Sequence, residues 1–212
     1  NVVALGSGVS MGFLGNSHFG LEDIAVMRTI PNLNIICPSD CLELKKVVED
    51  CSSIDRGPTY IRLTGVPGSK IVYEKDYSYK FIDFKTVKEG NDLLILSYGS
   101  ILGEVIDAAR MLENKNINVQ IVNVKILKPF NEKILKLINQ FKYLAIIEEH
   151  SSIGGLKSII SENLLDKNKN VKILALNLSD KFGPTGSYKY LLDYHNLSSE
   201  KIYQKILKFY KK

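Results

Sequence analysis

Short apolar segments alternate with amphipathic segments along the whole chain. The apolar segments have the length and composition of buried strands and comprise residues 2–5, 33–37, 59–63, 93–97, 119–124, 143–147 and 171–176. Apolar residues recur at helical spacing in the segments between them, which comprise residues 20–30, 101–112, 134–138, 156–164, 187–194 and 199–211. Strands that alternate with helices predict an α/β fold in which helices cover parallel sheets.

Local signals mark where several of these helices begin and end. Asp40 followed by Glu43 resembles a capping box, so a helix is expected to start there. Ser100 and Asn131 have side chains that suit the N-caps of two later helices. Pro31 ends the first predicted helix, because the residue before a proline disfavours helical geometry.

The strand–helix pattern breaks between residues 64 and 76, where glycine, proline and polar residues gather. We place a domain boundary here, which predicts two three-layer α/β domains that comprise residues 1–75 and 76–212. The first is expected to have a parallel sheet. The second is expected to have a mainly parallel sheet with one antiparallel edge strand at residues 81–87.

Composition describes an ordinary globular protein, with 45% hydrophobic and 24% charged residues. No apolar run approaches the roughly 18 residues of a membrane span, and no signal peptide is recognisable, so a cytoplasmic protein without a membrane partner is expected. The net charge of +5 is modest. The lysines at the end of the chain fall on the polar face of a helix, so they predict a solvated surface and no nucleic-acid partner.

The three cysteines are Cys37, Cys41 and Cys51. Their number is odd, they form no CxxC pattern, and the nearest histidines are far away in the sequence. This spacing excludes a disulfide framework and predicts no metal site, as expected for a reducing compartment.

The first candidate for chemistry is His18, which lies one turn ahead of the first predicted helix. The glycine-rich residues 6–16 precede it as a loop, and such loops allow the backbone to approach a ligand. An imidazole suits proton transfer near neutral pH, although a surface or capping histidine is the alternative. The spacing of Gly6, Gly8 and Gly12 differs from the dinucleotide fingerprint and excludes a nicotinamide site.

Other charged residues have structural as well as functional interpretations. Glu22 and Asp23 could be catalytic, but carboxylates in a first turn also complement the helix dipole, which is the favoured interpretation. Arg28 suits the end of the same helix or a buried ion pair. Arg62 lies in an apolar strand and therefore needs a paired acid or an anionic ligand, with the ion pair favoured.

Two later segments are also candidates. Residues 148–150, Glu-Glu-His, follow a predicted strand and are interpreted as a polar strand terminus at a subunit contact. Residues 180–187 contain glycines that could cradle an anion at a helix start, although a structural connector is the favoured interpretation.

Several motifs together resemble the transketolase-like enzymes, which use thiamine diphosphate. Residues 17–32 are similar to the family pattern S/T-H-x-x-x-E-D-x-x-x-x-R-x-x-P-N. The other similar motifs are ICPSD at 36–40, GPTYIRL at 57–63, EEH at 148–150, GGL at 154–156 and DKFG at 180–183. The resemblance covers nearly the whole chain. It implies a pyrimidine-binding domain followed by a transketolase C-terminal domain, without specifying a substrate.

The resemblance also implies a cofactor, partners and site residues. Thiamine diphosphate and Mg²⁺ would be held mainly by an N-terminal transketolase subunit, in a homodimer or heterotetramer with the active site between chains. His18 would be the catalytic residue that contacts substrate oxygens. Ser17, Gly15 and Arg62 would bind a sugar substrate, and no residue of this chain is expected to bind a metal.

Departures from the family pattern are equally informative. The pyrophosphate domain is absent, and the segment 1–6 reads as a core strand without a leader, so we expect a fragment that is inactive alone. The glutamate that contacts the cofactor ring would lie upstream of Asn1. Leu14 stands where the family has an aspartate that reads a sugar hydroxyl, and Thr64-Gly65 replaces an arginine region that holds the sugar phosphate.

We therefore expect the C-terminal component of a split transketolase-like enzyme that transfers a two-carbon ketol unit between sugars. The alternatives within the superfamily are a 1-deoxyxylulose-5-phosphate synthase-like enzyme and the beta subunit of a 2-oxoacid dehydrogenase. A non-catalytic dimerisation module is the alternative from a different class.

Overall fold

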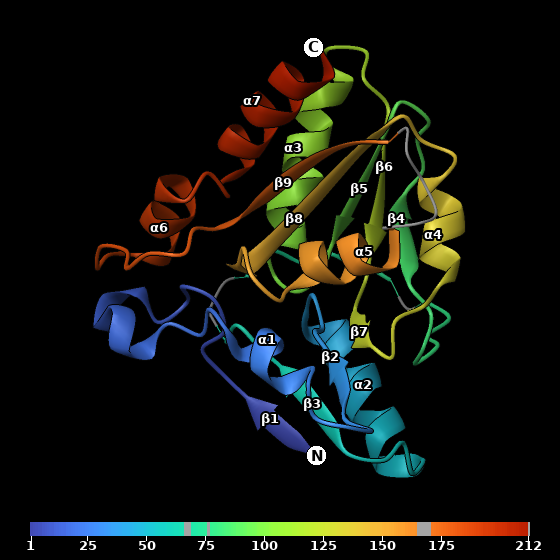
Figure 1. Ribbon diagram of the computed structural model, residues 1–212, viewed down its shortest axis with the longest axis vertical. Helices are drawn as coiled ribbons and strands as arrows, with labels where there is room; N and C mark the ends of the chain where they lie inside the picture. Colours follow the sequence, from blue (N-terminus) through green and yellow to red (C-terminus); the bar gives the residue numbers. More distant parts are fainter. Residues whose placement is uncertain (66–68, 76, 165–170, 212) are drawn as a thin grey trace.

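The computed structural model describes residues 1–65, 69–75, 77–164 and 171–211. Its strands form two sheets, one in the lower and one in the upper part of the molecule as seen in Figure 1. The amino and carboxyl ends of the chain lie at opposite ends of the molecule. Residues 66–68 and 76, which contribute to the predicted domain boundary, lie outside the described residues.

The smaller sheet has the strand order β1-β3-β2-β7. Its first three strands are β1 (Val2–Ala4), β3 (Thr59–Arg62) and β2 (Asn34–Ile36). They pair in parallel, as predicted, with Val2 opposite Tyr60 and Asn34 opposite Thr59. Parallel pairing follows from the intervening helices α1 (Asp23–Met27) and α2 (Cys41–Ser53), which return the chain to the same edge of the sheet.

The fourth strand of this sheet, β7 (Ile126–Lys128), comes from much later in the chain and pairs antiparallel with β2. A purely parallel first sheet was expected, so that prediction was incomplete. The reason is non-local, because β7 directly follows a strand of the other sheet and continues into this one. The two parts of the molecule therefore share a strand pairing as well as side-chain contacts.

The larger sheet has the order β4-β6-β5-β8-β9. Its strands are β4 (Lys85–Lys88), β5 (Leu93–Ser97), β6 (Val119–Asn123), β8 (Tyr143–Ser151) and β9 (Lys172–Leu178). The antiparallel edge strand is β4, and the other pairings are parallel, as the sequence predicted. All five residues of β5 and of β6 are buried, which is typical of central strands covered on both faces.

Helices cover both faces of the larger sheet (Figure 1). One face carries α3 (Leu102–Glu113), α6 (Tyr188–Tyr194) and α7 (Ser199–Tyr210), whose apolar residues join one buried cluster. The other face carries α4 (Lys133–Ile138) and α5 (Leu156–Leu164). Their cluster also includes Ile24, Ile35 and Tyr60 from the smaller unit, so the two units have a common core.

Helix starts differ from the sequence predictions in informative ways. Asp40 caps α2 by accepting from the Glu43 amide at 2.9 Å, as expected, while the Glu43 carboxylate bonds to Ser39. Ser100 does not cap α3. The N-cap there is Ile101, because the Ser100 hydroxyl lies 2.5 Å from that of Thr64 in the other unit.

The α4 cap is displaced by one residue from the prediction. Its N-cap is Glu132, although Asn131 Oδ1 still accepts from the Lys133 amide at 3.0 Å.

A search of the described residues finds no helix that is long and apolar enough to cross a membrane.

Candidate functional site

His18 lies on an exposed loop at the junction of the two units. The loop contains two short 3-10 helices, η1 (Gly12–Leu14) and η2 (Asn16–His18), which Gly15 joins with a positive φ of 77°. The side chains of Ser17 and His18 are exposed, and Ser17 Oγ lies 3.0 Å from His18 Nδ1. The structure thus brings Ser17 and His18 together at the surface.

Residues of the second unit fasten this loop. The Asn16 side-chain amide donates to the Gly183 carbonyl at 2.8 Å and its carbonyl accepts from the Gly183 amide at 2.9 Å. The Gly186 amide donates to the Gly12 carbonyl at 3.0 Å. Residues 180–187, interpreted as a connector, therefore also serve as the support for the loop that presents His18.

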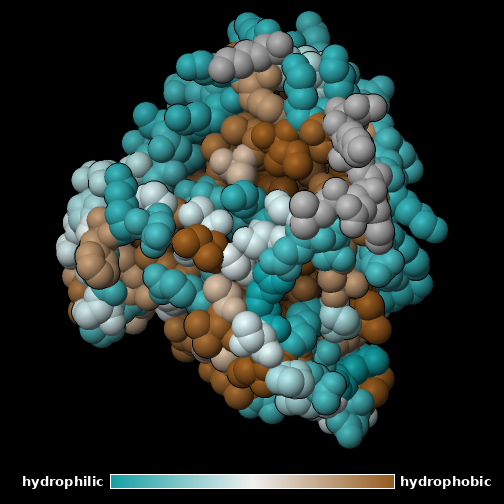
Figure 2. Space-filling view, in the orientation of Figure 1, coloured by the Kyte–Doolittle hydropathy of each residue, from teal (hydrophilic) through white to brown (hydrophobic). Residues whose placement is uncertain are grey.

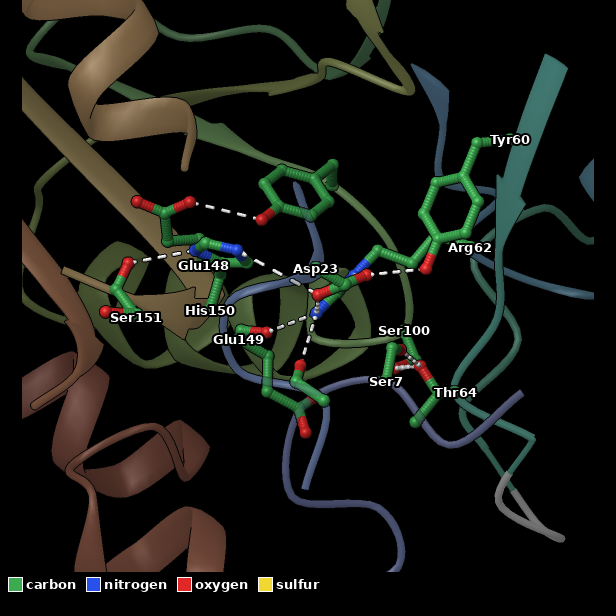
Figure 3. Close-up of polar contacts among 12 residues, drawn as sticks. Ser7, Asp23, Tyr60, Arg62, Thr64, Ser100, Glu148, Glu149, His150 and Ser151 are labelled. Carbon is green, nitrogen blue, oxygen red and sulfur yellow. Dashed lines mark hydrogen bonds and ion pairs between the residues drawn. The ribbon is translucent and has the colours of Figure 1, made fainter. Parts of the chain in front are cut away.

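A buried ion pair lies under the loop (Figure 3). Arg62 Nε donates to Asp23 Oδ2 at 2.7 Å, and the Tyr60 hydroxyl donates to the same oxygen at 2.8 Å. Arg62 Nη2 also donates to the carbonyls of Gly20 and Glu149. Burial would raise the pKa of Asp23, but the charge and hydrogen bonds of Arg62 outweigh this effect and hold the pKa below its ordinary value.

This geometry confirms the ion pair that the sequence favoured for Arg62. The residue is only 5% exposed, and its guanidinium contacts protein groups from α1, the loop and β8. A sugar-binding role for Arg62 stays a prediction. Its burial suits a residue that positions the loop more than one that touches a ligand.

The Glu148–His150 triplet was expected to end a strand as a polar terminus. That prediction was wrong, because β8 continues through Ser151 and all three side chains are buried. Burial of polar groups requires partners, which the neighbouring loops and helices supply. Glu148 accepts from the amides of Leu156 and Lys157 at the start of α5 and from the Tyr98 hydroxyl.

Glu149 points in the opposite direction along the same strand. Its Oε1 accepts from the Val9 amide at 2.8 Å and its Oε2 accepts from the Tyr188 hydroxyl at 2.7 Å. Burial raises its pKa to about 7, although both hydrogen bonds and the nearby Arg62 act in the opposite direction. The carboxyl therefore joins the glycine loop, β8 and α6.

His150 is a buried, neutral imidazole. Its Nδ1 donates to the Ser151 carbonyl at 3.0 Å, and its Nε2 lies 3.9 Å from Asp23 Oδ1 without a hydrogen-bond partner among the described residues. Burial and the positive charge of Arg62 lower its pKa to about 4. At neutral pH the ring thus adds no charge to the ion pair.

The remaining charged candidates have structural roles. Asp23 lies in the first turn of α1 and belongs to the buried ion pair, whereas Glu22 is an exposed N-cap. Arg28, at the end of α1, pairs with Glu162 of α5 at a more exposed position. These contacts confirm an ion pair for Arg28 and attach α1 to the second unit.

Within the described residues, no group of three or more His, Cys, Asp or Glu side chains could hold a metal ion. The carboxylates of Asp23 and Glu149, which lie closest to the glycine loop, are engaged by neighbouring groups. These residues do not fit a magnesium–diphosphate group. They fit one wall of a site, in which the loop presents an imidazole and a hydroxyl outward.

Two α/β units with parallel sheets, joined by a buried ion pair and carrying an outward-facing histidine loop, define the class of this protein. The description "Transketolase, pyrimidine binding domain" matches residues 1–65, and "Transketolase, C-terminal domain" matches residues 83–202. The chain belongs to the transketolase family, whose members are thiamine-diphosphate-dependent transferases.

Curated relatives agree with this membership. The chain is 33% identical over 213 residues to a transketolase C-terminal section from Methanocaldococcus jannaschii, which covers 100% of this chain and 66% of the relative. It is 31% identical over 214 residues to one of the subunits of the apulose-4-phosphate transketolase of Phocaeicola vulgatus, which covers 100% of this chain and 67% of the relative. The chain thus spans about two thirds of these relatives.

A solved structure described as a split gene transketolase, inactive beta4 tetramer, has a similar fold. It superposes with a TM-score of 0.82 and 28% identity over 97% of this chain and 64% of that chain. A 1-deoxy-D-xylulose-5-phosphate synthase from Caldanaerobacter subterraneus is 31% identical over 198 residues, which cover 93% of this chain but 32% of the relative. Both comparisons support the α/β architecture expected from the sequence.

The sequence did not reveal that Val9, Glu149 and Tyr188 meet. Glu149 lies 140 residues from Val9, and no spacing rule connects them. One signal was available: a run of charged residues directly after an apolar strand requires partners if the strand continues.

Proposed function

We propose that this chain is the C-terminal component of a split transketolase that transfers a two-carbon ketol unit between sugars. It would act only with an N-terminal subunit that carries the pyrophosphate domain, and would be inactive alone. The support is its similarity to proteins named as transketolase sections and subunits. Residues 1–75 would form part of the pyrimidine domain, and residues 76–212 would form the C-terminal domain.

The observation that carries this proposal is the placement of His18. An exposed imidazole on a loop that the second unit holds at Gly12 and Asn16 is available to a ligand from outside the chain. When Ser17 Oγ donates to Nδ1, the ring proton resides on Nε2, from which it can be donated to a substrate oxygen. His18 would thus orient the sugar and exchange a proton with one of its oxygens.

Thiamine diphosphate, when bound with Mg²⁺ mainly to the partner, supplies the carbanion stabilisation that ketol transfer requires. The residues of this chain would bind and orient the sugar. Ser17 would set the orientation of the His18 ring. Gly15 would bring its backbone close to the substrate, and Arg62 would act from below by holding the loop through the Gly20 carbonyl.

The assembly would be a homodimer of complete units, or a heterotetramer of two chains of each kind. Its support is apolar surface on the smaller unit, which Figure 2 shows in the region of β1 and α1. The exposed side chains there include Val2, Val3 and Val26, at 53%, 57% and 63% exposure. A contiguous apolar surface of this kind favours a protein partner over a nucleic acid, and we place the complex in the cytoplasm.

Two enzymatic alternatives and one structural alternative remain for the test. A 1-deoxyxylulose-5-phosphate synthase-like enzyme would use the same loop with a different acceptor, as would the beta subunit of a 2-oxoacid dehydrogenase. A dimerisation module would need no His18 chemistry. The exposed Ser17–His18 pair favours the enzyme.

The test is a coupled ketol-transfer assay on the full-length protein mixed with its N-terminal subunit, thiamine diphosphate and Mg²⁺. Phosphorylated and unphosphorylated sugars are compared for wild type, His18→Ala and Lys136→Ala. The last variant is the control, because Lys136 is exposed on α4 at the opposite side of the molecule (Figure 1).

Turnover that needs both chains and falls at least tenfold in His18→Ala only would support the proposal. Turnover that is unchanged in His18→Ala would remove His18 from the site. No turnover of sugars, together with transfer to a lipoyl domain, would establish the dehydrogenase alternative.

A further inference from the structure

The Glu149 carboxyl connects two segments that otherwise meet only at the far end of the histidine loop. Its Oε1 receives the Val9 amide, near the start of the loop, and its Oε2 receives the hydroxyl of Tyr188, at the start of α6. The side chain is buried, with 4% of the residue exposed. Neither partner can be replaced by solvent at this depth.

The chain is built for this close approach. Gly8 has a positive φ of 65°, and a Cβ at this position would lie 2.2 Å from Glu149 Oε1. Any larger residue would displace the carboxyl from the loop. The missing side chain at residue 8 is therefore what allows Glu149 to reach the Val9 amide.

Both partners of Glu149 lead directly to His18. From Val9, the loop runs through Gly12 and Asn16 to the histidine. The Gly183–Gly186 segment, which bonds to Gly12 and Asn16, continues directly into Tyr188. Glu149 thus closes a ring of contacts, with the loop on one side and its support on the other.

We propose that Glu149 is a positioning residue for His18, acting by accepting hydrogen bonds from the Val9 amide and the Tyr188 hydroxyl. The inference rests on the proposed function of His18 and deepens it. A hydrogen-bond acceptor is the required feature, since Val9 needs one oxygen whether the carboxyl is charged or neutral. Glutamine supplies that oxygen, and methionine, with similar length and no such acceptor, does not.

The test uses the full-length protein with its N-terminal subunit. Glu149→Met and Glu149→Gln are compared with wild type by amide hydrogen exchange and by ketol-transfer kinetics. Glu148→Met is the matched control, because Glu148 is a neighbouring buried carboxylate that bonds to α5 and not to the loop. Each variant is also made in the His18→Ala background.

In Glu149→Met, residues 6–18 are expected to exchange about tenfold faster and kcat to fall about tenfold, with KM changed by less than about threefold. Glu149→Gln is expected to stay within about twofold of wild type. In the His18→Ala background, Glu149→Met should cause no further loss, because positioning acts only through the histidine. Glu148→Met should instead accelerate exchange at the start of α5.

Unchanged exchange in the loop of Glu149→Met would overturn the proposal, as would a loss of kcat that adds fully to that of His18→Ala. The exchange measurement needs no turnover. It therefore separates a failure of this inference from a failure of the proposed function, which would appear as wild-type protein without transferase activity.

Discussion

Asn16 and Gly183 lie 167 residues apart in the chain and exchange two hydrogen bonds, with N···O distances of 2.8 and 2.9 Å. The asparagine amide reads the backbone of the second unit as a partner strand would. Because Asn16 is two residues from His18, this pair decides where the imidazole lies relative to the core.

Replacement of Asn16 by alanine should loosen the loop with little effect on the fold. The side chain is exposed, so the free energy of unfolding should fall by no more than about 1 kcal/mol. Ketol transfer should fall several-fold, because the histidine loses its fixed position. Thermal melting and steady-state kinetics of the reconstituted complex check both parts, with the exposed Asn114→Ala as control. Equal losses in both variants would contradict the prediction.

Removal of the buried arginine should be far more costly. Arg62→Met leaves Asp23 buried without its counter-ion, and the free energy of unfolding is expected to fall by about 3–5 kcal/mol. Chemical denaturation measures this change. The matched control is Arg28→Met in the more exposed pair with Glu162, which should cost less than about 1 kcal/mol. Similar costs for the two variants would show that the Arg62–Asp23 pair is not effectively buried.

Gly8→Ala should destabilise the protein by two separate effects. The positive φ costs about 1–2 kcal/mol for a residue with a side chain. The added methyl group must also displace Glu149. Gly57→Ala isolates the first effect, because Gly57 has a φ of 75° and no atom lies within 4 Å of its Cβ position. Denaturation curves should show a clearly larger loss for Gly8→Ala, and equal losses would mean that the carboxyl moves aside freely.

Glu149 should make stability depend on pH. Burial raises its pKa from 4.5 to about 7, so the folded protein keeps a proton that the unfolded chain has already released between these values. The stabilising contribution is complete below pH 4.5 and is lost as the pH rises to about 7. The total is about 3 kcal/mol.

The difference in unfolding free energy between wild type and Glu149→Gln isolates this effect from other titrating groups. The groups that face Glu149 are Tyr188 of α6, Arg62 of β3 and Asp23 of α1. The two neighbours on β8, Glu148 and His150, titrate in both proteins. Relative to the variant, wild type should lose stability from pH 4.5 to 7 and then level off. A difference that is flat across this range would show that the Glu149 carboxyl has an ordinary pKa.

Much of the fold was readable because the apolar periods are local. Strand β5 was predicted without error, and the edge position of β4 was correct although it begins four residues later than expected. Predicted features of single residues were less dependable where a distant group competed for them. Ser100 has the side chain of an N-cap, yet its hydroxyl pairs with Thr64 across the unit boundary.

By itself, the sequence determined the alternation of strands and helices, the family motifs and the choice of His18, since each depends on neighbours within a few turns of the chain. Only the tertiary structure decided that β7 joins the first sheet, that Glu148–His150 are buried, and that Glu149 holds Val9 and Tyr188 together. The physical reason is that buried polar groups must find partners wherever the fold brings them, and that choice is made between residues more than a hundred positions apart.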